Sequence, residues 1–134
     1  MLGEQIAELK GKITGQRVLD AEGPNMETTI SAKRSFKGTQ VIDTLTFVSR
    51  SSTEGVVHGR GCRVLISVGS PGMATYTSQG VGRISSSGAT KWLGAHFYRT
   101  SSNGKLAFLN NIVAILEAEI DTEGNLVEKI WEWK

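Results

Sequence analysis

The sequence contains one cysteine, two prolines and no long apolar run, and each shortage excludes a class of protein. The single cysteine, Cys62, cannot form an intrachain disulfide, and with only two histidines it offers no zinc-ligand spacing. No apolar stretch approaches the roughly 20 residues that a membrane-spanning helix needs. Residues 1–10 lack the basic segment followed by an apolar one that marks a secretory signal. We therefore expect a cytoplasmic protein with no metal, no cofactor and no membrane partner.

Neither sign of charge is in large excess. The chain has 15 Lys and Arg against 13 Asp and Glu, which gives a formal net charge of +2. Nucleic-acid-binding surfaces usually carry a larger basic excess, so no nucleic-acid partner is expected. The 134 residues fit a single domain, 1–134, which is long enough to bury a core without disulfides.

Glycine, serine and threonine are abundant and gather in short, regularly spaced stretches that are typical of turns. The segments between them are rich in Val, Ile, Thr and aromatic residues, which favour strands. The expected strands are 6–20, 26–35, 40–49, 56–68, 73–84, 89–100, 105–121 and 126–134. This pattern predicts an all-β fold, an antiparallel meander barrel of about eight strands, with at most one short helix over 2–10.

The turns also predict which residues face the barrel interior, because each turn fixes the register of its hairpin. We centre the four turns after residue 56 on Ser70-Pro71, Ser86-Ser87, Asn103-Gly104 and Glu123-Gly124. Five polar side chains then point inward near one end of the barrel, namely Arg63, Tyr76, Ser78, Arg99 and Asn110. Apolar residues that include Leu65, Phe97, Phe108, Ile112, Leu116 and Trp131 line the rows below them.

These five residues form the candidate ligand-binding site. Two guanidinium groups, a phenol and an amide near one barrel mouth suit a carboxylate, and the apolar rows suit a hydrophobic body. In the alternative interpretation Arg63 pairs with an internal carboxylate such as Asp43 and simply fills the barrel, since buried charges are usually paired.

The opposite face of the sheet is expected to be the outer surface. It carries most of the charge, together with His58, Cys62, His96, Glu117, Glu119 and Glu128. It also carries an apolar set, Val64, Ile66, Val68, Val81, Trp92, Leu109, Val113 and Ile115, that is larger than a monomer usually exposes. We therefore expect a homo-oligomer in which barrels pack against each other.

The layout resembles the allene oxide cyclase-like barrels over roughly residues 10–134. The likeness rests on the eight-strand meander, on Ala74–Gly82 (ATYTSQGVG), on Lys105–Asn111 (KLAFLNN) and on the terminal Lys129–Lys134 segment. The resemblance implies a barrel cavity and, for the cyclases themselves, isomerisation of a fatty-acid epoxide by a carboxylate and a bound water. The expected register leaves no inward glutamate after residue 56, so no catalytic residue is assigned from the family.

Three functions are consistent with these features. The first is binding of a small hydrophobic or amphipathic anion, such as a fatty acid, inside the barrel. The second is an isomerase or cyclase that acts on a hydrophobic substrate in the same place. The third is an oligomeric structural or interaction protein whose barrel is filled by its own side chains. Whether the protein is an enzyme is left open by the sequence, and binding is the preferred interpretation.

Overall fold

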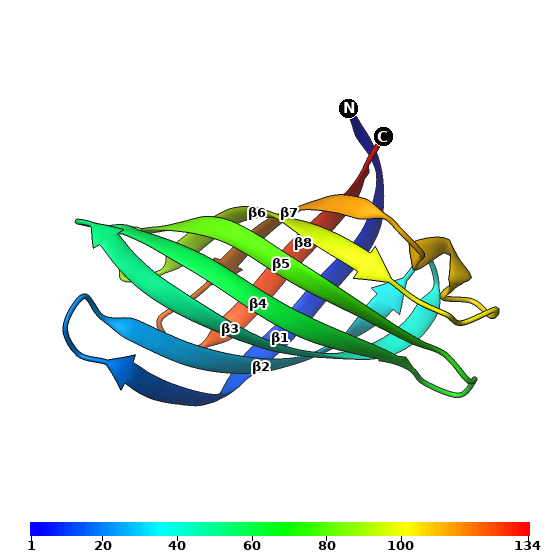
Figure 1. Cartoon of the computed structure of the whole chain (residues 1–134), viewed down its shortest axis with the longest axis horizontal. Helices are drawn as coiled ribbons and strands as arrows, with labels where there is room; N and C mark the ends of the chain where they lie inside the picture. Colours follow the sequence, from blue (N-terminus) through cyan, green and yellow to red (C-terminus); the bar gives the residue numbers. More distant parts are fainter.

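The computed structural model describes the backbone of all residues 1–134 and every side chain except that of Arg34. Eight antiparallel strands follow one another along the chain (Figure 1). They are β1 (Leu2–Asp20), β2 (Asn25–Phe36), β3 (Thr39–Thr53), β4 (Val56–Ser67), β5 (Met73–Ile84), β6 (Thr90–Arg99), β7 (Val113–Ile120) and β8 (Asn125–Trp133). A short 3₁₀-helix, η1 (Ala107–Leu109), lies between β6 and β7.

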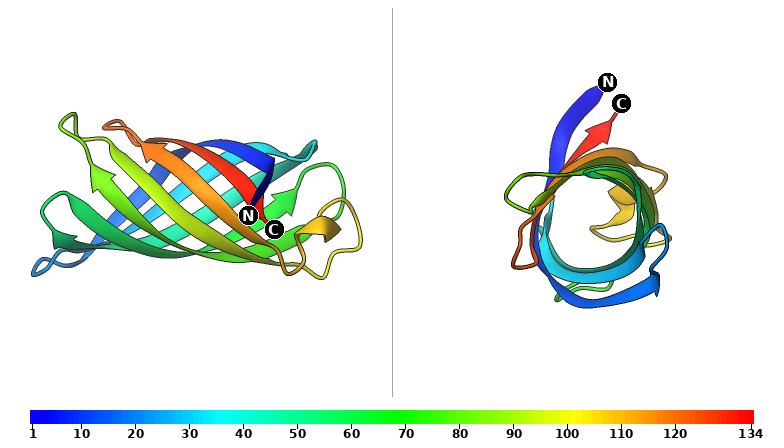
Figure 2. Two further views of the ribbon diagram at one scale, coloured as in Figure 1. Left: turned by 90° about the horizontal axis from the view of Figure 1, so that it is seen from above. Right: turned by 90° about the vertical axis from the view of Figure 1, so that its left-hand side faces the viewer.

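Each strand pairs with its neighbour in sequence, and β1 pairs with β8, so the sheet closes into a barrel. Figure 2 shows this closed ring when the barrel is viewed along its axis. The two chain ends leave the barrel side by side, where the backbone N–H of Lys134 donates to the carbonyl of Met1 at 2.8 Å. The eight-stranded all-β meander predicted from the sequence is therefore confirmed.

Two expected strands begin at different residues in the structure. The sequence allowed at most one short helix over 2–10, and this segment is instead the first half of β1, which pairs on both sides, with β2 and with β8. The expected strand over 105–121 begins only at Val113, because residues 105–112 form η1 and its flanking turns. In η1 the side chain of Leu109 is fully buried, and that of the preceding Leu106 is as well. This segment therefore closes one end of the barrel with apolar side chains. A continued β-strand in its place would have left that end open.

The barrel interior contains two apolar clusters at different heights. The larger one lies at the end closed by η1 and contains, among others, Leu9, Phe36, Leu65, Leu106 and Ile130. The smaller one lies toward the opposite end, where the β1–β2, β3–β4, β5–β6 and β7–β8 turns gather, and it contains Ile30, Leu45, Leu116, Ala118 and Leu126. Polar side chains occupy the level between the two clusters. None of the described helical segments is long and apolar enough to cross a membrane.

Glycines on neighbouring strands allow the barrel wall to bend sharply. A Cβ atom on Gly94 would lie 2.4 Å from the carbonyl oxygen of Gln79, and one on Gly80 would lie 2.8 Å from the carbonyl oxygen of Leu93. Gly80 and Gly94 are directly paired between β5 and β6. The two backbones therefore approach each other more closely here than side chains would permit, which is how small barrels coil.

Candidate functional site

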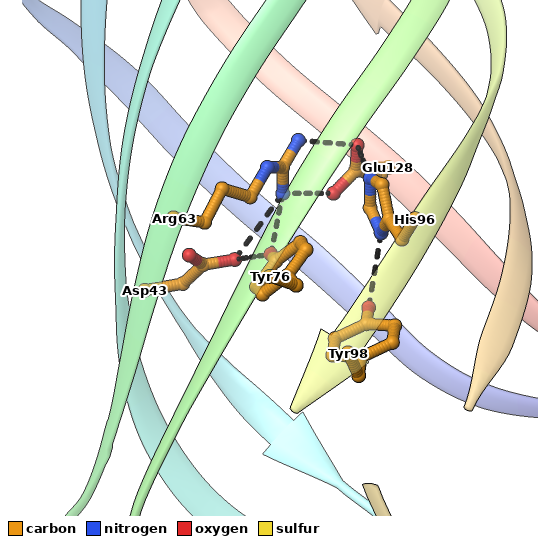
Figure 3. A network of polar contacts seen from close by, with 6 residues as sticks. All are labelled: Asp43, Arg63, Tyr76, His96, Tyr98 and Glu128. Carbon is orange, nitrogen blue, oxygen red and sulfur yellow. Dashed lines mark hydrogen bonds and ion pairs between the residues drawn. The ribbon is translucent and has the colours of Figure 1, made fainter. Parts of the chain in front are cut away.

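Six polar or aromatic side chains from five strands meet at the centre of the barrel (Figure 3). Side chains alternate between the two faces of a strand, and in this register the inward set includes Asp43 on β3, Arg63 on β4, Tyr76 on β5, His96 and Tyr98 on β6, and Glu128 on β8. All six are buried. A charged cluster at this depth is stable only if its members satisfy one another.

Arg63 is the hub of the cluster. Its two terminal nitrogens donate to both carboxylate oxygens of Glu128, at 2.8 and 2.9 Å. One of these nitrogens also donates to the Tyr76 hydroxyl at 2.7 Å and to Asp43 at 3.3 Å. Burial alone would lower the pKa of the Arg63 guanidinium, but Glu128, Tyr76 and Asp43 raise it well above its usual value. Arg63 is therefore a fixed cation whose two terminal nitrogens are paired, while its Nε is buried without an acceptor among the described residues.

Asp43 is the member of the cluster whose charge changes closest to neutral pH. Burial raises the pKa of its carboxyl group to about 6, although Arg63 and the hydrogen bond donated by Tyr76 both favour the ionised form. Its second oxygen, Oδ1, has no hydrogen-bond partner among the described side chains. Asp43 therefore changes charge at a pH close to that of many cells.

His96 and Tyr98 complete the cluster on the β6 side. The Nδ1 atom of His96 lies 3.0 Å from the Tyr98 hydroxyl, and Nε2 lies 3.8 Å from a carboxylate oxygen of Glu128. Burial, helped by the charge of Arg63, lowers the pKa of His96 well below its usual value. The imidazole is therefore neutral and, like both tyrosines, whose pKa values burial raises, contributes hydrogen bonds rather than charge.

A cavity of about 50 Å³ lies directly above the Arg63–Glu128 pair, on the side away from η1. Its wall is mainly apolar and includes Ile30, Leu45, Phe47, Trp92, Leu116 and Leu126. Arg63 and Glu128 form its deep end, and Ser78 and Gln79 also line it. Toward the barrel end, Phe47, Trp92 and Ile120 are only partly buried, so the cavity reaches the surface there. The space is roughly that of four water molecules, so a ring-sized group would lie partly inside it and partly in the open mouth.

Glycines also make room for the aromatic wall of the cavity. A Cβ on Gly59 would lie 2.8 Å from the indole ring of Trp92, and one on Gly82 would lie 2.9 Å from the same ring. The Trp92 indole therefore lies against two bare stretches of backbone. It packs edge-to-face on Phe47, with ring centroids 5.6 Å apart. Gly59 and Gly82 thus leave the space that the Trp92 indole occupies in the cavity wall.

Of the five residues predicted to bind a ligand, three face the interior and two do not. Arg63 and Tyr76 lie in the central cluster, and Ser78 lines the cavity. Arg99 and Asn110 are exposed on the outside, beside each other near the β6–β7 connection. The contact between Asp43 and Arg63 that the sequence suggested as an alternative is present. The proposed convergence of two guanidinium groups is therefore wrong, because only one of them is inside.

Turn geometry explains the error at Arg99. Five residues separate the last paired positions of each hairpin, Ile84 and Thr90 in β5–β6 and Ile120 and Leu126 in β7–β8. Gly88 and Gly124 in these turns have positive φ angles of 90° and 83°. A glycine in that conformation adds one residue to a hairpin turn. The two-residue turns expected there give the opposite parity, and a one-residue change in register inverts the strand that follows.

The β6–β7 connection also departs from its expected register: a turn centred on Asn103-Gly104 places Leu93 opposite Ala114, whereas Leu93 pairs with Glu117. This second odd shift returns β7 to the predicted faces. β6 and β8 were therefore predicted inside out, while β4, β5 and β7 kept the correct faces.

This inversion also hid the three residues that complete the cluster. His96 and Glu128 were expected on the outer surface, and Tyr98 was not assigned a role, yet all three are almost fully buried. The inward glutamate that the register seemed to exclude is therefore Glu128. The Ser85–Gly88 and Asp121–Gly124 segments, each with a glycine in fourth place, were the signal in the sequence that could have corrected the register.

The outer surface also differs from the prediction, because residues expected outside lie inside and the reverse. Trp92 lines the cavity and Leu109 is fully buried, whereas Leu93 and Phe97, which were expected inside, are 60% and 49% exposed. Val64, Ile66, Val68 and Val113 are exposed as predicted. An outer apolar patch of Leu93, Ala95, Phe97, Val113 and Ile115 therefore covers neighbouring positions on β6 and β7.

Comparison with known proteins finds similar folds and gives no information on the site. No protein-family model and no curated protein matches the chain. A protein of unknown function from Clostridium acetobutylicum ATCC 824 has a similar structure, with a TM-score of 0.81, 12% identity and 98% of each chain covered. A β-barrel-like protein from Acinetobacter baumannii AYE is similar with a TM-score of 0.80 and 12% identity, over 100% of this chain and 96% of that one. At this identity the similarity is one of fold alone.

Proposed function

We propose that this barrel binds a small hydrophobic or amphipathic ligand in the cavity above the Arg63–Glu128 pair. The observation that carries the proposal is the asymmetry of the interior. One end is packed with apolar side chains and closed by η1, whereas the other contains an apolar cavity with a fixed polar pair at its deep end. Apolar walls with a few placed polar groups are the usual composition of a small-molecule site, and barrel mouths are a common location.

The size of the cavity limits the ligand. A volume of about 50 Å³ accepts the end of a chain or part of a ring, and the remainder of the ligand must lie in the partly buried mouth between Phe47, Trp92 and Ile120. Ethylbenzene is therefore a suitable probe, because it has one ring and no polar group. Its binding tests the cavity without any assumption about a head group.

A filled cavity provides the test. In Ala118→Phe, a benzyl side chain would occupy space that now lies open between Leu116 and Ile120, and ethylbenzene binding measured by calorimetry should be lost. The matched control is Glu119→Phe, which adds a similar ring to the exposed outer face of the same strand and should leave binding unchanged. Equal ethylbenzene affinity in both variants, or no measurable binding to the unchanged protein, would refute the proposal.

A second candidate, an isomerase of the allene oxide cyclase-like kind, is supported by one observation. Glu128 supplies a carboxylate at the deep end of the cavity, as such a reaction requires. Both of its oxygens accept hydrogen bonds from Arg63, which makes Glu128 less available as a base, and binding is therefore the preferred function. Conversion of a fatty-acid epoxide to a product of the same mass, abolished in Glu128→Gln, would favour the isomerase instead.

The partner that we propose is a second copy of the chain. The outer apolar patch of Leu93, Ala95, Phe97, Val113 and Ile115 supports this, since monomers rarely expose adjoining apolar residues on two strands. The patch lies on the outside of the wall that lines the cavity. An oligomer formed there would leave the mouth of the cavity free.

A further inference from the structure

The two charged groups that line the deep end of the cavity are paired with each other. The guanidinium of Arg63 and the carboxylate of Glu128 are joined by two hydrogen bonds, and both residues line the cavity. A carboxylate on the ligand would have to displace Glu128 from Arg63 or lie beside it. An ammonium group on the ligand would likewise have to displace Arg63 from Glu128 or lie beside it. Either ion would lose its hydration without gaining an unpaired counter-ion, which makes both unfavourable.

Two neutral hydrogen-bonding groups in the cavity wall, by contrast, have no partner in the central cluster. Ser78 lines the cavity, and its hydroxyl takes part in none of the hydrogen bonds of the central cluster. Trp92 also lines it, and its indole N–H is buried with no acceptor among the described side chains. Buried donors in proteins almost always have an acceptor. Arg63, which also lines the cavity, likewise has a buried Nε–H without an acceptor in the described part of the chain. A hydrogen-bond acceptor is therefore what this wall lacks.

From these two observations we infer that the cavity selects a neutral ligand with a hydrogen-bond acceptor oxygen, such as a ketone, over a carboxylate or an amine. Ser78 and Trp92 are the residues that determine this specificity. The inference rests on the proposed function, since it names the chemical class of the occupant of the same cavity. It departs from the anionic ligand that the sequence predicted, because the guanidinium that suggested an anion already has its carboxylates.

Four probes of similar size, each with one ring and eight carbons, separate the possibilities. They are ethylbenzene, acetophenone, phenylacetate and 2-phenylethylamine, titrated calorimetrically into the unchanged protein at neutral pH. A net hydrogen bond of about 1 kcal/mol corresponds to about a fivefold gain, so acetophenone should bind about fivefold more tightly than ethylbenzene. Phenylacetate and 2-phenylethylamine should each bind at least about tenfold more weakly than acetophenone, because both bring an unpaired charge into the cavity.

Two variants locate the hydrogen bond. Ser78→Ala removes the hydroxyl, and Trp92→Phe removes the N–H while keeping an aromatic wall. The advantage of acetophenone over ethylbenzene should disappear in at least one of them. A general loss of structure would instead weaken both probes equally.

The outcomes distinguish this inference from the proposal beneath it. If none of the four probes binds, the proposed function itself fails. If ethylbenzene binds but acetophenone gains nothing, or if phenylacetate binds most tightly, the cavity is a ligand site and the inferred selectivity is wrong. Retention of the full acetophenone advantage in both variants would likewise overturn the role of Ser78 and Trp92.

Discussion

Arg63 on β4 and Glu128 on β8 lie on strands from opposite sides of the barrel, and their side chains meet in the middle through two hydrogen bonds of 2.8 and 2.9 Å. The pair divides the interior, with a packed apolar end on the η1 side and the cavity on the other. Because each strand contributes only one member, the contact forms only when the barrel is closed in the correct register. The pair therefore links the closure of the fold to the floor of the proposed binding site.

Removing one member of this pair should be costly. In Glu128→Ala the guanidinium of Arg63 would lose two of its hydrogen bonds while remaining 5% exposed. Loss of one partner from a buried ion pair typically costs about 3–5 kcal/mol, and we expect that decrease in the free energy of unfolding. Urea denaturation followed by circular dichroism measures it. Glu119→Ala on the outer face of β7 is the control and should stay within about 0.5 kcal/mol; an equal effect of the two changes would show that Arg63 does not depend on Glu128.

Asp43 should make stability depend on pH in an unusual direction. Because burial raises its pKa to about 6 from 3.8, the folded protein binds the proton before the unfolded chain does as the pH falls. The contribution of Asp43 to the free energy of unfolding is therefore most favourable below about pH 4. It falls by about 3 kcal/mol as the pH rises through 6. His96, with a lowered pKa, acts in the opposite sense over part of this range, so the total slope is not diagnostic.

Asp43→Asn isolates this contribution. The free energy of unfolding of the unchanged protein minus that of the variant should decrease between pH 4 and pH 7.5, because only the unchanged protein must ionise a buried carboxyl group. Urea denaturation of both proteins across this range gives the difference. A difference that is constant or that increases with pH would mean that Asp43 is ionised at little cost.

Close backbone approach at the glycine pair predicts a contrast between two identical substitutions. Gly94→Ala would place a methyl group 2.4 Å from the Gln79 carbonyl oxygen, and relief requires β5 and β6 to separate. We expect a loss of about 1–3 kcal/mol, as for other overpacked sites. At Gly15 nothing lies within 4 Å, so Gly15→Ala should be neutral or stabilising by up to about 1 kcal/mol. Thermal denaturation compares them, and equal melting temperatures would contradict the described packing of β5 on β6.

Self-association is tested at the outer apolar patch. Phe97→Lys would place an ammonium group in the interface between two copies and should convert an oligomer to monomers, because burying an unpaired charge costs several kcal/mol. Val18→Lys is the control, since Val18 is an exposed apolar residue near the other end of a different strand. Light scattering at tens of micromolar measures the mass. A monomeric unchanged protein, or dissociation by Val18→Lys alone, would refute this use of the patch.

The fold could be predicted from the sequence because strand propensity and turn spacing are local properties. The eight strands and their order follow from them, and Arg63, Tyr76 and Ser78 were placed inside because an even change in register leaves the faces of β4 and β5 unaltered. A turn centred on Ser70-Pro71 places Gly61 opposite Gly80, and the observed partner of Gly61 is Ser78, a shift of two residues. Arg99 and Glu128 were misplaced because they follow turns in which one glycine at positive φ reverses the parity.

The cavity itself was beyond local reasoning. Its walls come from seven different strands, and its floor depends on which side chain from β8 faces Arg63 across the barrel. No spacing of residues along the chain shows which side chains face each other across the barrel. η1 was likewise hidden, because Leu106 and Leu109 have the same apolar character whether they continue a strand or fold back into the barrel end.

The most direct test of the central claim, that the barrel interior holds a ligand above the Arg63–Glu128 pair, is a crystal structure of the protein soaked with acetophenone. We predict density for one ring between Trp92 and Leu116, with the carbonyl oxygen within hydrogen-bond distance of Ser78 or the Trp92 N–H and with both hydrogen bonds between Arg63 and Glu128 intact. An interior filled by the protein's own side chains, with acetophenone absent or bound only on the outer surface, would contradict it.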